Sequence, residues 1–341
     1  MSLKILIAGQ GIAGAVLANT LRAAGVIVCI ADTTPFVSSS ALAAGVINPV
    51  TGKRYAKSWG FDLFFPFAQQ FYTQLAQQAG EQIWYDFPII RLLGSHLESN
   101  EWNLRAARPE FEGLMGVAED AIDWKGLISA DFTCGLLHRA ARVDFEVVLR
   151  FTRTLFSATG QWLPEYIAPD QTDSWLNSFD RIIFCEGHKG ASNPFFPGIP
   201  WQCAKGERLL IALDDEREIR HMLKKHIMIV PVGPNKYWVG ANYIWDFEDS
   251  APTPGGLQFL TDELDQTLLC GYRILAHGAA VRPVVKDRRP IIGWSKEDPR
   301  IGIFNGTGSK GALLAPYWAD HFTGHICGET AINTEVEVGR F

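Results

Sequence analysis

The first 32 residues constrain the fold of this chain more than any other segment. Residues 4–8 (KILIA) form a short, continuous apolar run after the leading lysine, which is typical of a buried parallel strand. A stretch with apolar residues at helical spacing runs from residue 12 to about residue 24. Between them lies the pattern G-x-G-x-x-G, made of Gly9, Gly11 and Gly14. A glycine pattern placed between a strand and a helix predicts a βαβ unit that binds a dinucleotide.

Each residue of this turn has a mechanical task in such a unit. Gly9 permits the tight turn, Gly11 lets the backbone approach a pyrophosphate, and Gly14 lets the helix pack closely on the strand. The free N–H groups at the helix start, around Ile12 and Ala13, offer a partial positive charge to the phosphates. These five residues are therefore predicted to contact the cofactor.

An acidic residue follows the second predicted strand, residues 26–30. Asp32 lies 18 residues after Gly14, where a carboxylate can accept hydrogen bonds from ribose hydroxyls. An acid at this position favours an unphosphorylated ribose, and hence FAD or NAD over NADP. The motif alone does not separate FAD from NAD.

Two further segments suit a flavin. The stretch "SSSALAAGVINPVTGKRYAKSW" (38–59) holds Ala44, Gly45 and Val46, small residues past which a flat ring could lie close to the backbone. An ordinary surface loop is the alternative for this stretch. The predicted strand in "DRIIFCEG" ends at Gly187, which we also expect at the cofactor.

The segment "IGIFNGTGSKGALLAPYWAD", from residue 301, separates the two cofactors. It predicts a strand, a glycine-rich turn and an amphipathic helix. Such a helix start stabilises negative charge, which a reduced flavin carries on its N1–C2=O edge and a nicotinamide ring does not. The segment therefore favours FAD, through Gly306, Gly308, Ser309, Lys310 and Gly311.

Composition limits the class of protein. A chain of 341 residues suggests two domains. A net charge of −6 argues against nucleic acid as a partner, and the lack of a long apolar run predicts no membrane span. Six scattered cysteines without C-x-x-C indicate reduced, buried thiols of a cytoplasmic protein, with no metal site. A homo-oligomer is possible, and the sequence does not decide the oligomeric state.

Taken together and in order, these motifs resemble the D-amino acid oxidase and glycine oxidase (DAO) superfamily of FAD-dependent oxidoreductases. The resemblance covers essentially the whole chain and is also carried by "RVDFEVVLRFT", "KGERLLI", "HIMIVPVGPNKYWVGANYIWDFEDSAPT" and "AAVRPVVKDRRPIIG". It implies an α/β fold in which a Rossmann-like FAD domain of the glutathione-reductase type, with a parallel sheet, is interleaved with an α+β substrate domain built on a mostly antiparallel sheet. Some relatives attach FAD through Cys or His. The "SSALAAG" loop has no His and "VVKDRRPIIG" has no Cys, so non-covalent FAD is expected.

The predicted elements agree with two interleaved domains. We assign residues 1–86, 139–200 and 279–341 to the FAD-binding domain, and 87–138 and 201–278 to the substrate-binding domain. The expected strands of the substrate domain are 204–213, 226–231, 236–243 and 272–282. Two further helices are expected at 256–269 and 144–156.

Arg282 is the main candidate for substrate binding. It lies in a run of small apolar residues, is followed by Pro283, and has no acidic residue within four positions. An arginine cannot shed its charge, so its partner is either a distant carboxylate of the fold or a ligand. In the family that the chain resembles, an arginine in an R-P motif at the end of a strand pairs with the substrate carboxylate. Arg288 and Arg289, in a polar turn, are expected to be solvated.

The resemblance implies oxidation of a C–N bond of an amino acid or amine. A hydride passes to flavin N5 and the imine hydrolyses, a reaction that depends mainly on positioning. Oxygen is the expected acceptor, and Lys53, Arg54 and Lys205 are candidate cations near it; an ordinary surface position is at least an equal alternative for each. We take Arg282, Lys310 and Tyr243 as catalytic candidates. Tyr243 and Trp245 could supply aromatic walls or a hydroxyl, and packing in a core is an equal alternative for both.

Substrate identity stays open, because the chain departs from the family pattern. Met228 stands where relatives often have a tyrosine, and Ser309-Lys310 where they often have an arginine. One alternative is a flavoenzyme that acts on a modified tRNA nucleoside or a glycated amine. Another is a dehydrogenase with a different electron acceptor, or a flavin-binding module without turnover. No role is assigned to the histidines, His138, His188, His277 and His321 among them.

Overall fold

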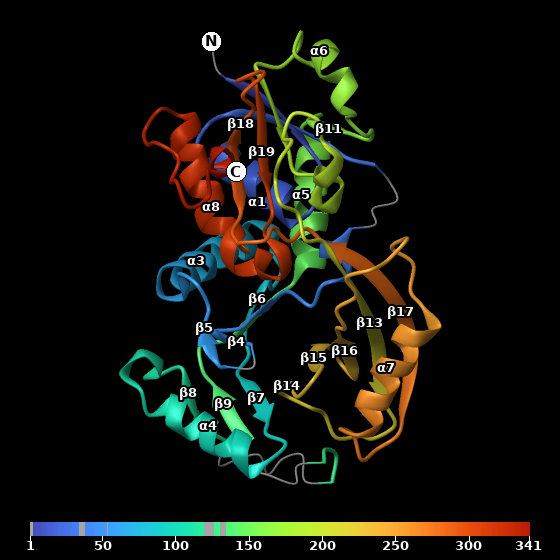
Figure 1. Ribbon diagram of the computed structural model, residues 1–341. Coiled ribbons are helices and arrows are strands. Elements are labelled where there is room, and N and C mark those ends of the chain that lie inside the picture. Colours follow the sequence, from blue (N-terminus) through green and yellow to red (C-terminus); the bar gives the residue numbers. More distant parts are fainter. Residues whose placement is uncertain (1–2, 34–37, 53, 119–125, 130–133) are drawn as a thin grey trace.

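The computed structural model describes residues 3–33, 38–52, 54–118, 126–129 and 134–341. Two large sheets dominate it. A mainly parallel six-stranded sheet lies in the upper half of Figure 1 and an eight-stranded sheet in the lower half. A three-stranded sheet, in the order β3-β10-β6, and a two-stranded sheet, β4-β5, complete the strands. Their bounds are β3 (Val46–Ile47), β4 (Val50–Thr51), β5 (Ala56–Lys57), β6 (Trp84–Asp86) and β10 (Ala141–Val143).

The six-stranded sheet has the order β11-β2-β1-β12-β19-β18. All neighbouring pairs are parallel except β18 and β19, which are antiparallel. The apolar run predicted at residues 4–8 is β1, and it is buried on both sides because helices cover the sheet. The strands are β1 (Lys4–Ala8), β2 (Ile27–Ala31), β11 (Trp162–Leu163), β12 (Arg181–Phe184), β18 (Ile291–Trp294) and β19 (Ile301–Asn305).

The eight-stranded sheet has the order β17-β13-β16-β15-β14-β7-β9-β8. Its neighbours are antiparallel except β14 and β7. One face packs on helix α7 (Pro254–Asp265), whose Leu260 and Leu264 share a core with Leu209 and Ile211. The strands are β7 (Ile89–Leu92), β8 (Met115–Val117), β9 (Cys134–Leu137), β13 (Ala204–Leu213), β14 (Met222–Lys224), β15 (Met228–Gly233), β16 (Lys236–Gly240) and β17 (Tyr272–Arg282).

Helices α1 (Ile12–Ala23) and α8 (Gly311–Ile326) contact each other beside the six-stranded sheet, with α5 (Phe145–Ala158) next to α1 (Figure 1). Helix α5 begins where its sequence predicts, because the Asp144 side chain accepts a hydrogen bond from the N–H of Val147 at 3.3 Å. The remaining helices are α2 (Ser39–Leu42), α3 (Phe61–Ala79), α4 (His96–Ala106) and α6 (Thr172–Trp175).

The fold class expected from the sequence is confirmed. Strands β13 and β17 match their predicted ranges to the residue, whereas the strand expected at 236–243 ends at Gly240. The helix expected at 256–269 begins two residues earlier, because Thr253 caps it, and ends at Asp265. The division into two domains stays a prediction, and its boundary at 278/279 falls inside β17.

No helix in the described ranges is long and apolar enough to cross a membrane. All six cysteines are free, as expected. Cys29, Cys134 and Cys185 are buried and Cys203 and Cys270 are partly buried, but Cys327 is exposed, so the expectation of buried thiols is wrong for Cys327. The cytoplasmic location and the oligomeric state stay predictions.

Candidate active site

A pocket connects the two sheets. At one end it is lined by loops that follow β1, β2, β12 and β19. At the other end it is lined by side chains on one face of β13, β14, β15, β16 and β17. Ligands of open parallel sheets bind outside the carboxyl ends of the strands, so the first part suits a dinucleotide. The other end of the pocket is lined by the eight-stranded sheet.

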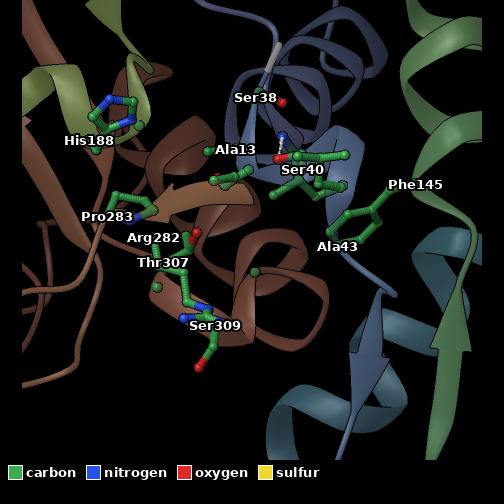
Figure 2. Close-up of a pocket in the computed structure, with 18 of the residues that line it drawn as sticks. Ala13, Ser38, Ser40, Ala43, Phe145, His188, Arg282, Pro283, Thr307 and Ser309 are labelled. Atoms are coloured by element: carbon green, nitrogen blue, oxygen red, sulfur yellow. Dashed lines mark hydrogen bonds between the residues drawn. The ribbon is translucent and has the colours of Figure 1, made fainter. Parts of the chain in front are cut away.

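The glycine turn before α1 forms part of the wall. Gly9, Gly11, Ile12 and Ala13 line the pocket, and Figure 2 shows Ala13 there. Gly14 is not among the lining residues. A Cβ at Gly14 would overlap the carbonyl oxygen of Gly9, so its task is to let α1 approach the end of β1. Four of the five residues predicted to contact the cofactor therefore line the pocket, whereas Gly14 lies outside the lining.

The start of α1 has a partner that the sequence analysis missed. The N–H of Ile12 donates to Oγ of Ser40 at 2.9 Å, drawn as a dashed line in Figure 2. Ser40 belongs to α2 and is buried in the pocket wall. Gly11 gives α1 no side-chain cap, so the amides of the first turn other than that of Ile12 have no capping side chain. The signal for Ser40 was its place in the small-residue loop.

Asp32 is anchored at the end of β2. Its carboxylate accepts hydrogen bonds from the N–H of Gln10 at 2.6 Å and of Thr33 at 2.7 Å. Burial raises the pKa of Asp32, and the two backbone N–H groups offset part of that rise. The carboxylate lines the pocket beside the glycine turn, which is the place expected for a ribose.

A second acid, Glu186, lies at the end of β12 and was not predicted. It accepts hydrogen bonds from Nδ2 of Asn193 at 2.8 Å and from the hydroxyl of Tyr166 at 3.2 Å. Burial raises its pKa. The next residue, the predicted Gly187, also lines the pocket, and its carbonyl accepts from Nδ2 of Asn305 at 2.9 Å.

The small-residue loop runs along the pocket as expected. Ala44, Gly45 and Val46 all line it. A Cβ at Gly45 would overlap the carbonyl oxygen of Val143, so only glycine allows this close approach of two backbones. The loop is also tied to the other sheet, because Nε1 of Trp238 donates to the carbonyl of Leu42 at 2.8 Å.

The turn before α8 is only partly at the pocket. Gly308, Ser309 and Gly311 line it, and Figure 2 shows Ser309 there. The N–H of Gly308 donates to the carbonyl of Pro283 at 3.2 Å. Gly306 lies outside the lining. Lys310 also lies outside it, since its ammonium donates to Oγ of Ser58 at 3.4 Å. Burial, and to a lesser degree Arg288, lowers the pKa of Lys310.

Arg282 ends β17 and faces the pocket. Its guanidinium lies 4.2 Å from the ring centre of Tyr243 and donates to the carbonyl of Asn242 at 3.3 Å. No carboxylate in the described part of the chain forms an ion pair with it. Burial lowers the pKa of this guanidinium. Of the two partners considered for Arg282, a distant carboxylate of the fold and a ligand, the described residues do not supply the first.

Tyr243 and Trp245 do not pack in a core. Tyr243 lines the pocket with 54% of its surface exposed, and Trp245 is 59% exposed. The two rings stack with centroids 6.2 Å apart. The ring of Tyr243 thus forms an exposed aromatic wall beside Arg282.

Two cations of the pocket were missed. Nε and Nη1 of Arg208, on β13, are buried and have no hydrogen-bond partner among the described residues. Lys224, on β14, donates to the carbonyl of His226 at 2.7 Å, and burial, aided by Arg91, lowers its pKa to about 8. The alternation in "KGERLLI" places Arg208 on the same face as Gly206, but it does not say that this face meets the pocket.

The candidate cations for oxygen fall elsewhere. Lys205 lines no part of the pocket, and its ammonium pairs with Asp249 at 3.6 Å. Arg54 is exposed and Lys53 lies outside the described residues. Arg288 is exposed as expected, but the expectation of solvation is wrong for Arg289. That residue pairs with Glu335 and lies 4.7 Å over the ring of Trp59.

Of the histidines, His188 lines the pocket, and burial lowers its pKa. His277 instead bonds the fully buried carboxylate of Glu207 at 2.8 Å. Glu207 also accepts from the N–H and hydroxyl of Thr253. This cluster lies on the α7 side of the sheet, away from the pocket.

The fold and the pocket define a dinucleotide-binding protein whose cofactor end opens onto an antiparallel sheet. Residues 4–324 match the model of the DAO family, FAD dependent oxidoreductase. The chain therefore belongs to this family of FAD-dependent oxidoreductases.

Individual relatives support the same placement. The chain is 30% identical to a glycine oxidase of Bacillus subtilis over 216 residues, which cover 60% of this chain and 54% of that protein. It is 24% identical to the tRNA 5-methylaminomethyl-2-thiouridine biosynthesis bifunctional protein MnmC of Marinobacter nauticus, across 98% of this chain and 58% of that protein. The match thus spans little more than half the length of either relative. The crystal structure of glycine oxidase from Geobacillus kaustophilus shares the fold, with a TM-score of 0.77 and 18% identity over 98% of this chain and 97% of that one.

Proposed function

We propose that the protein oxidises the C–N bond of an amino acid or a related amine, with FAD as the hydride acceptor and oxygen as the final acceptor. One observation carries this proposal. Arg282 is a partly buried cation that faces the pocket and has no carboxylate partner among the described residues. A substrate carboxylate would supply that partner.

The residues present fit FAD. The uncapped amides at the start of α1 suit the pyrophosphate, and Asp32 suits a ribose hydroxyl. The backbone of Ala44, Gly45 and Val46 suits the flat ring system. The start of α8, with Gly308 and Ser309, suits the edge of the ring where negative charge develops. Bound FAD would supply the acceptor for the hydride, and we propose that these residues hold it non-covalently.

Arg282 acts by positioning. A guanidinium donates two parallel hydrogen bonds to a carboxylate and so fixes the plane and direction of the bound amino acid. The ring of Tyr243 lies against one face of the guanidinium. Nη1 and Nη2 also donate to the carbonyl of Asn242, at 3.3 and 3.4 Å, so a substrate carboxylate would bind through the N–H groups that this carbonyl does not take. Holding two reactants in the correct orientation removes much of the entropic barrier. No side-chain base is required if the amine binds in its neutral form.

A second candidate is an FAD-dependent enzyme that acts on a modified nucleoside of tRNA. The relation to the tRNA-modifying protein across 98% of this chain favours it, and so does the exposed pair Tyr243 and Trp245, since unstacked bases bind to aromatic rings. The net charge of −6 weighs against an RNA surface. A gel-shift assay with tRNA at moderate salt distinguishes the two, because only the nucleoside enzyme shifts it.

The proposed function is tested by anaerobic titration of the FAD-loaded protein with glycine, sarcosine, proline and a panel of D- and L-amino acids. Bleaching of the flavin absorbance by one of them, followed by peroxide formation in air, is the expected result. Bleaching without peroxide formation would show that the final electron acceptor is a molecule other than oxygen. A loaded protein that no amino acid bleaches would contradict the amino acid proposal and favour a larger amine.

A further inference from the structure

The pocket-facing side of the eight-stranded sheet carries three cations, Arg208, Lys224 and Arg282. The described residues that this sheet contributes to the pocket include no acid. We propose that Arg208 binds a second anionic group of the substrate, so that the preferred substrate is an amine with two carboxylates. This inference rests on the proposed function, in which Arg282 binds the first carboxylate.

The two arginines lie at neighbouring places on the sheet. Arg208 pairs across the sheet with Gly278, and its Nε lies 3.7 Å from the position that a Cβ at Gly278 would take. The guanidinium of Arg282 lies over Gly206, where a Cβ would overlap it. Each arginine therefore extends over a glycine of the adjacent strand, which leaves room for it against the sheet.

The register gives the spacing of these two places. Gly206 pairs with Ala280, and Gly278 lies two residues from Ala280 on the same face. Gly206 and Gly278 are therefore diagonal neighbours, which lie about 7–8 Å apart in an antiparallel pair. Two guanidinium groups at that spacing can each hold one end of a short dicarboxylate. An amine nitrogen on the chain between the ends would stay beside Arg282.

Arg208 has few other ways to satisfy its charge. Its Nε and Nη1 are buried without a partner in the described ranges, and burial lowers its pKa. An unpaired buried donor of a charged group destabilises the site, so a ligand that supplies an acceptor gains affinity. The acids of the pocket, Asp32 and Glu186, follow strands of the other sheet and already accept hydrogen bonds.

Lys224 lies farther along the sheet, and its ammonium already donates to the carbonyl of His226 at 2.7 Å. It lies in the same cross-strand row as Arg208, beyond Gly240 and Met228. Three strand spacings separate the two backbones, which is about 14 Å. Arg208 is consequently the group that selects a short diacid, and Lys224 adds positive potential at the far end of the pocket.

The inference predicts discrimination between acids. A substrate with one carboxylate would leave Arg208 unpaired, and sites built to bond a polar group reject analogues that lack it. Aspartate, glutamate and iminodiacetate should therefore reduce the flavin more efficiently than alanine, glycine and sarcosine. The main rival is that Arg208 pairs with FAD itself, in which case its removal weakens FAD binding and leaves the choice of acid unchanged.

The test uses unreactive acids, so it does not depend on turnover. Malonate, succinate and glutarate are compared with acetate, propionate and butyrate by the change each causes in the spectrum of the FAD-loaded protein. Wild type is compared with Arg208→Met and Arg208→Lys. Arg273→Met, which removes an exposed arginine of the neighbouring strand β17, is the matched control.

We expect wild type and Arg273→Met to bind the best dicarboxylate at least about tenfold more tightly than the matching monocarboxylate. Arg208→Met should lose that difference and keep its monocarboxylate affinity. Arg208→Lys, which keeps the charge without the planar fork, should keep part of it. A wild type without the preference would overturn the inference even if Arg208→Met does not fold. An Arg208→Met protein that loses FAD and not the preference would overturn it in favour of the cofactor.

The two proposals fail in different ways. Dicarboxylate preference in a protein whose flavin no amine bleaches would support the role of Arg208 and contradict the proposed function. Flavin bleaching that is equally efficient with one or two carboxylates would support the proposed function and contradict the role of Arg208.

Discussion

The guanidinium of Arg282 lies directly over the backbone of Gly206 on the neighbouring strand. The ring of Tyr243 and the carbonyl of Asn242 hold it from other sides. The arginine is thereby oriented before any substrate arrives, and its remaining donors face the pocket. Preorganised donors of this kind lose little conformational entropy when a carboxylate binds.

The relationship between Arg282 and Gly206 is testable by adding a methyl group. Gly206→Ala should displace the guanidinium and raise KM for the amino acid substrate by about tenfold or more, since each 1.4 kcal/mol of lost binding is a factor of ten. Steady-state kinetics measure this effect. Gly233→Ala, where a Cβ would meet nothing closer than 3.9 Å, is the control. Unchanged KM in Gly206→Ala would show that Arg282 does not bind substrate from this position.

Asp32 should contribute to FAD affinity. Asp32→Asn removes a charged acceptor that the N–H groups of Gln10 and Thr33 orient, and should weaken FAD by about 1–3 kcal/mol. Because burial raises the pKa of Asp32, FAD affinity in wild type should fall as the pH falls through that raised value. Fluorescence titration of the apoprotein measures both effects. Equal affinities and equal pH profiles in the two proteins would remove Asp32 from the site; Asp173→Asn, at an exposed position, is the control.

Lys224 should make stability depend on pH in alkaline solution. Its pKa is lowered to about 8 in the fold, against about 10.4 in an unfolded chain. Between these values the unfolded state binds more protons, so the free energy of unfolding rises with pH. Between pH 8 and 10.4 the free energy of unfolding of wild type should rise by about 2 kcal/mol relative to that of Lys224→Met. This is less than the whole pKa shift would give, because solvent reaches the ammonium.

Denaturant unfolding at several pH values measures this difference. Lys236→Met, at an exposed position, controls for the loss of a lysine. Parallel profiles for wild type and Lys224→Met would show that Lys224 is solvated.

FAD should leave the protein when it unfolds. The loop at Ala44–Val46 has no histidine, and the segment after Arg282 has no cysteine before Ile292. Acid precipitation should therefore release all flavin into the supernatant, where absorbance measures it. Flavin that stays with the pellet after washing would show a covalent bond.

The sequence predicted those features that depend on local pattern. The strand, glycine turn and helix of the first 32 residues follow from apolar spacing, and β13 and β17 agree to the residue. Arg282 could be singled out because it is a lone charge among small apolar residues. These are short-range signals, and the structure reproduces them.

What the sequence could not predict depends on pairing between distant segments. Lys205, Glu207 and Arg208 lie within four residues of one strand, and alternation alone cannot say which face meets the pocket. Only the fold shows Glu207 bonded to His277 on the α7 side and Arg208 on the other. Lys310 was placed correctly at a helix start, but its side chain contacts Ser58, 252 residues away.

The central claim is that Arg282 holds the carboxylate of an amino acid substrate beside the flavin. Its most direct test is the anaerobic rate of flavin reduction by the best amino acid and by the amine that lacks its carboxylate, in wild type and in Arg282→Met. Removing a partner of such a charge pair costs about 2–5 kcal/mol, so kcat/KM for the amino acid should fall about 30-fold or more. The amine without the carboxylate should reduce the flavin slowly, and at the same rate in both proteins. Removing the carboxylate and removing the guanidinium break the same interaction, so their effects do not add. An Arg282→Met protein that reduces its flavin with the amino acid as fast as wild type would contradict the account.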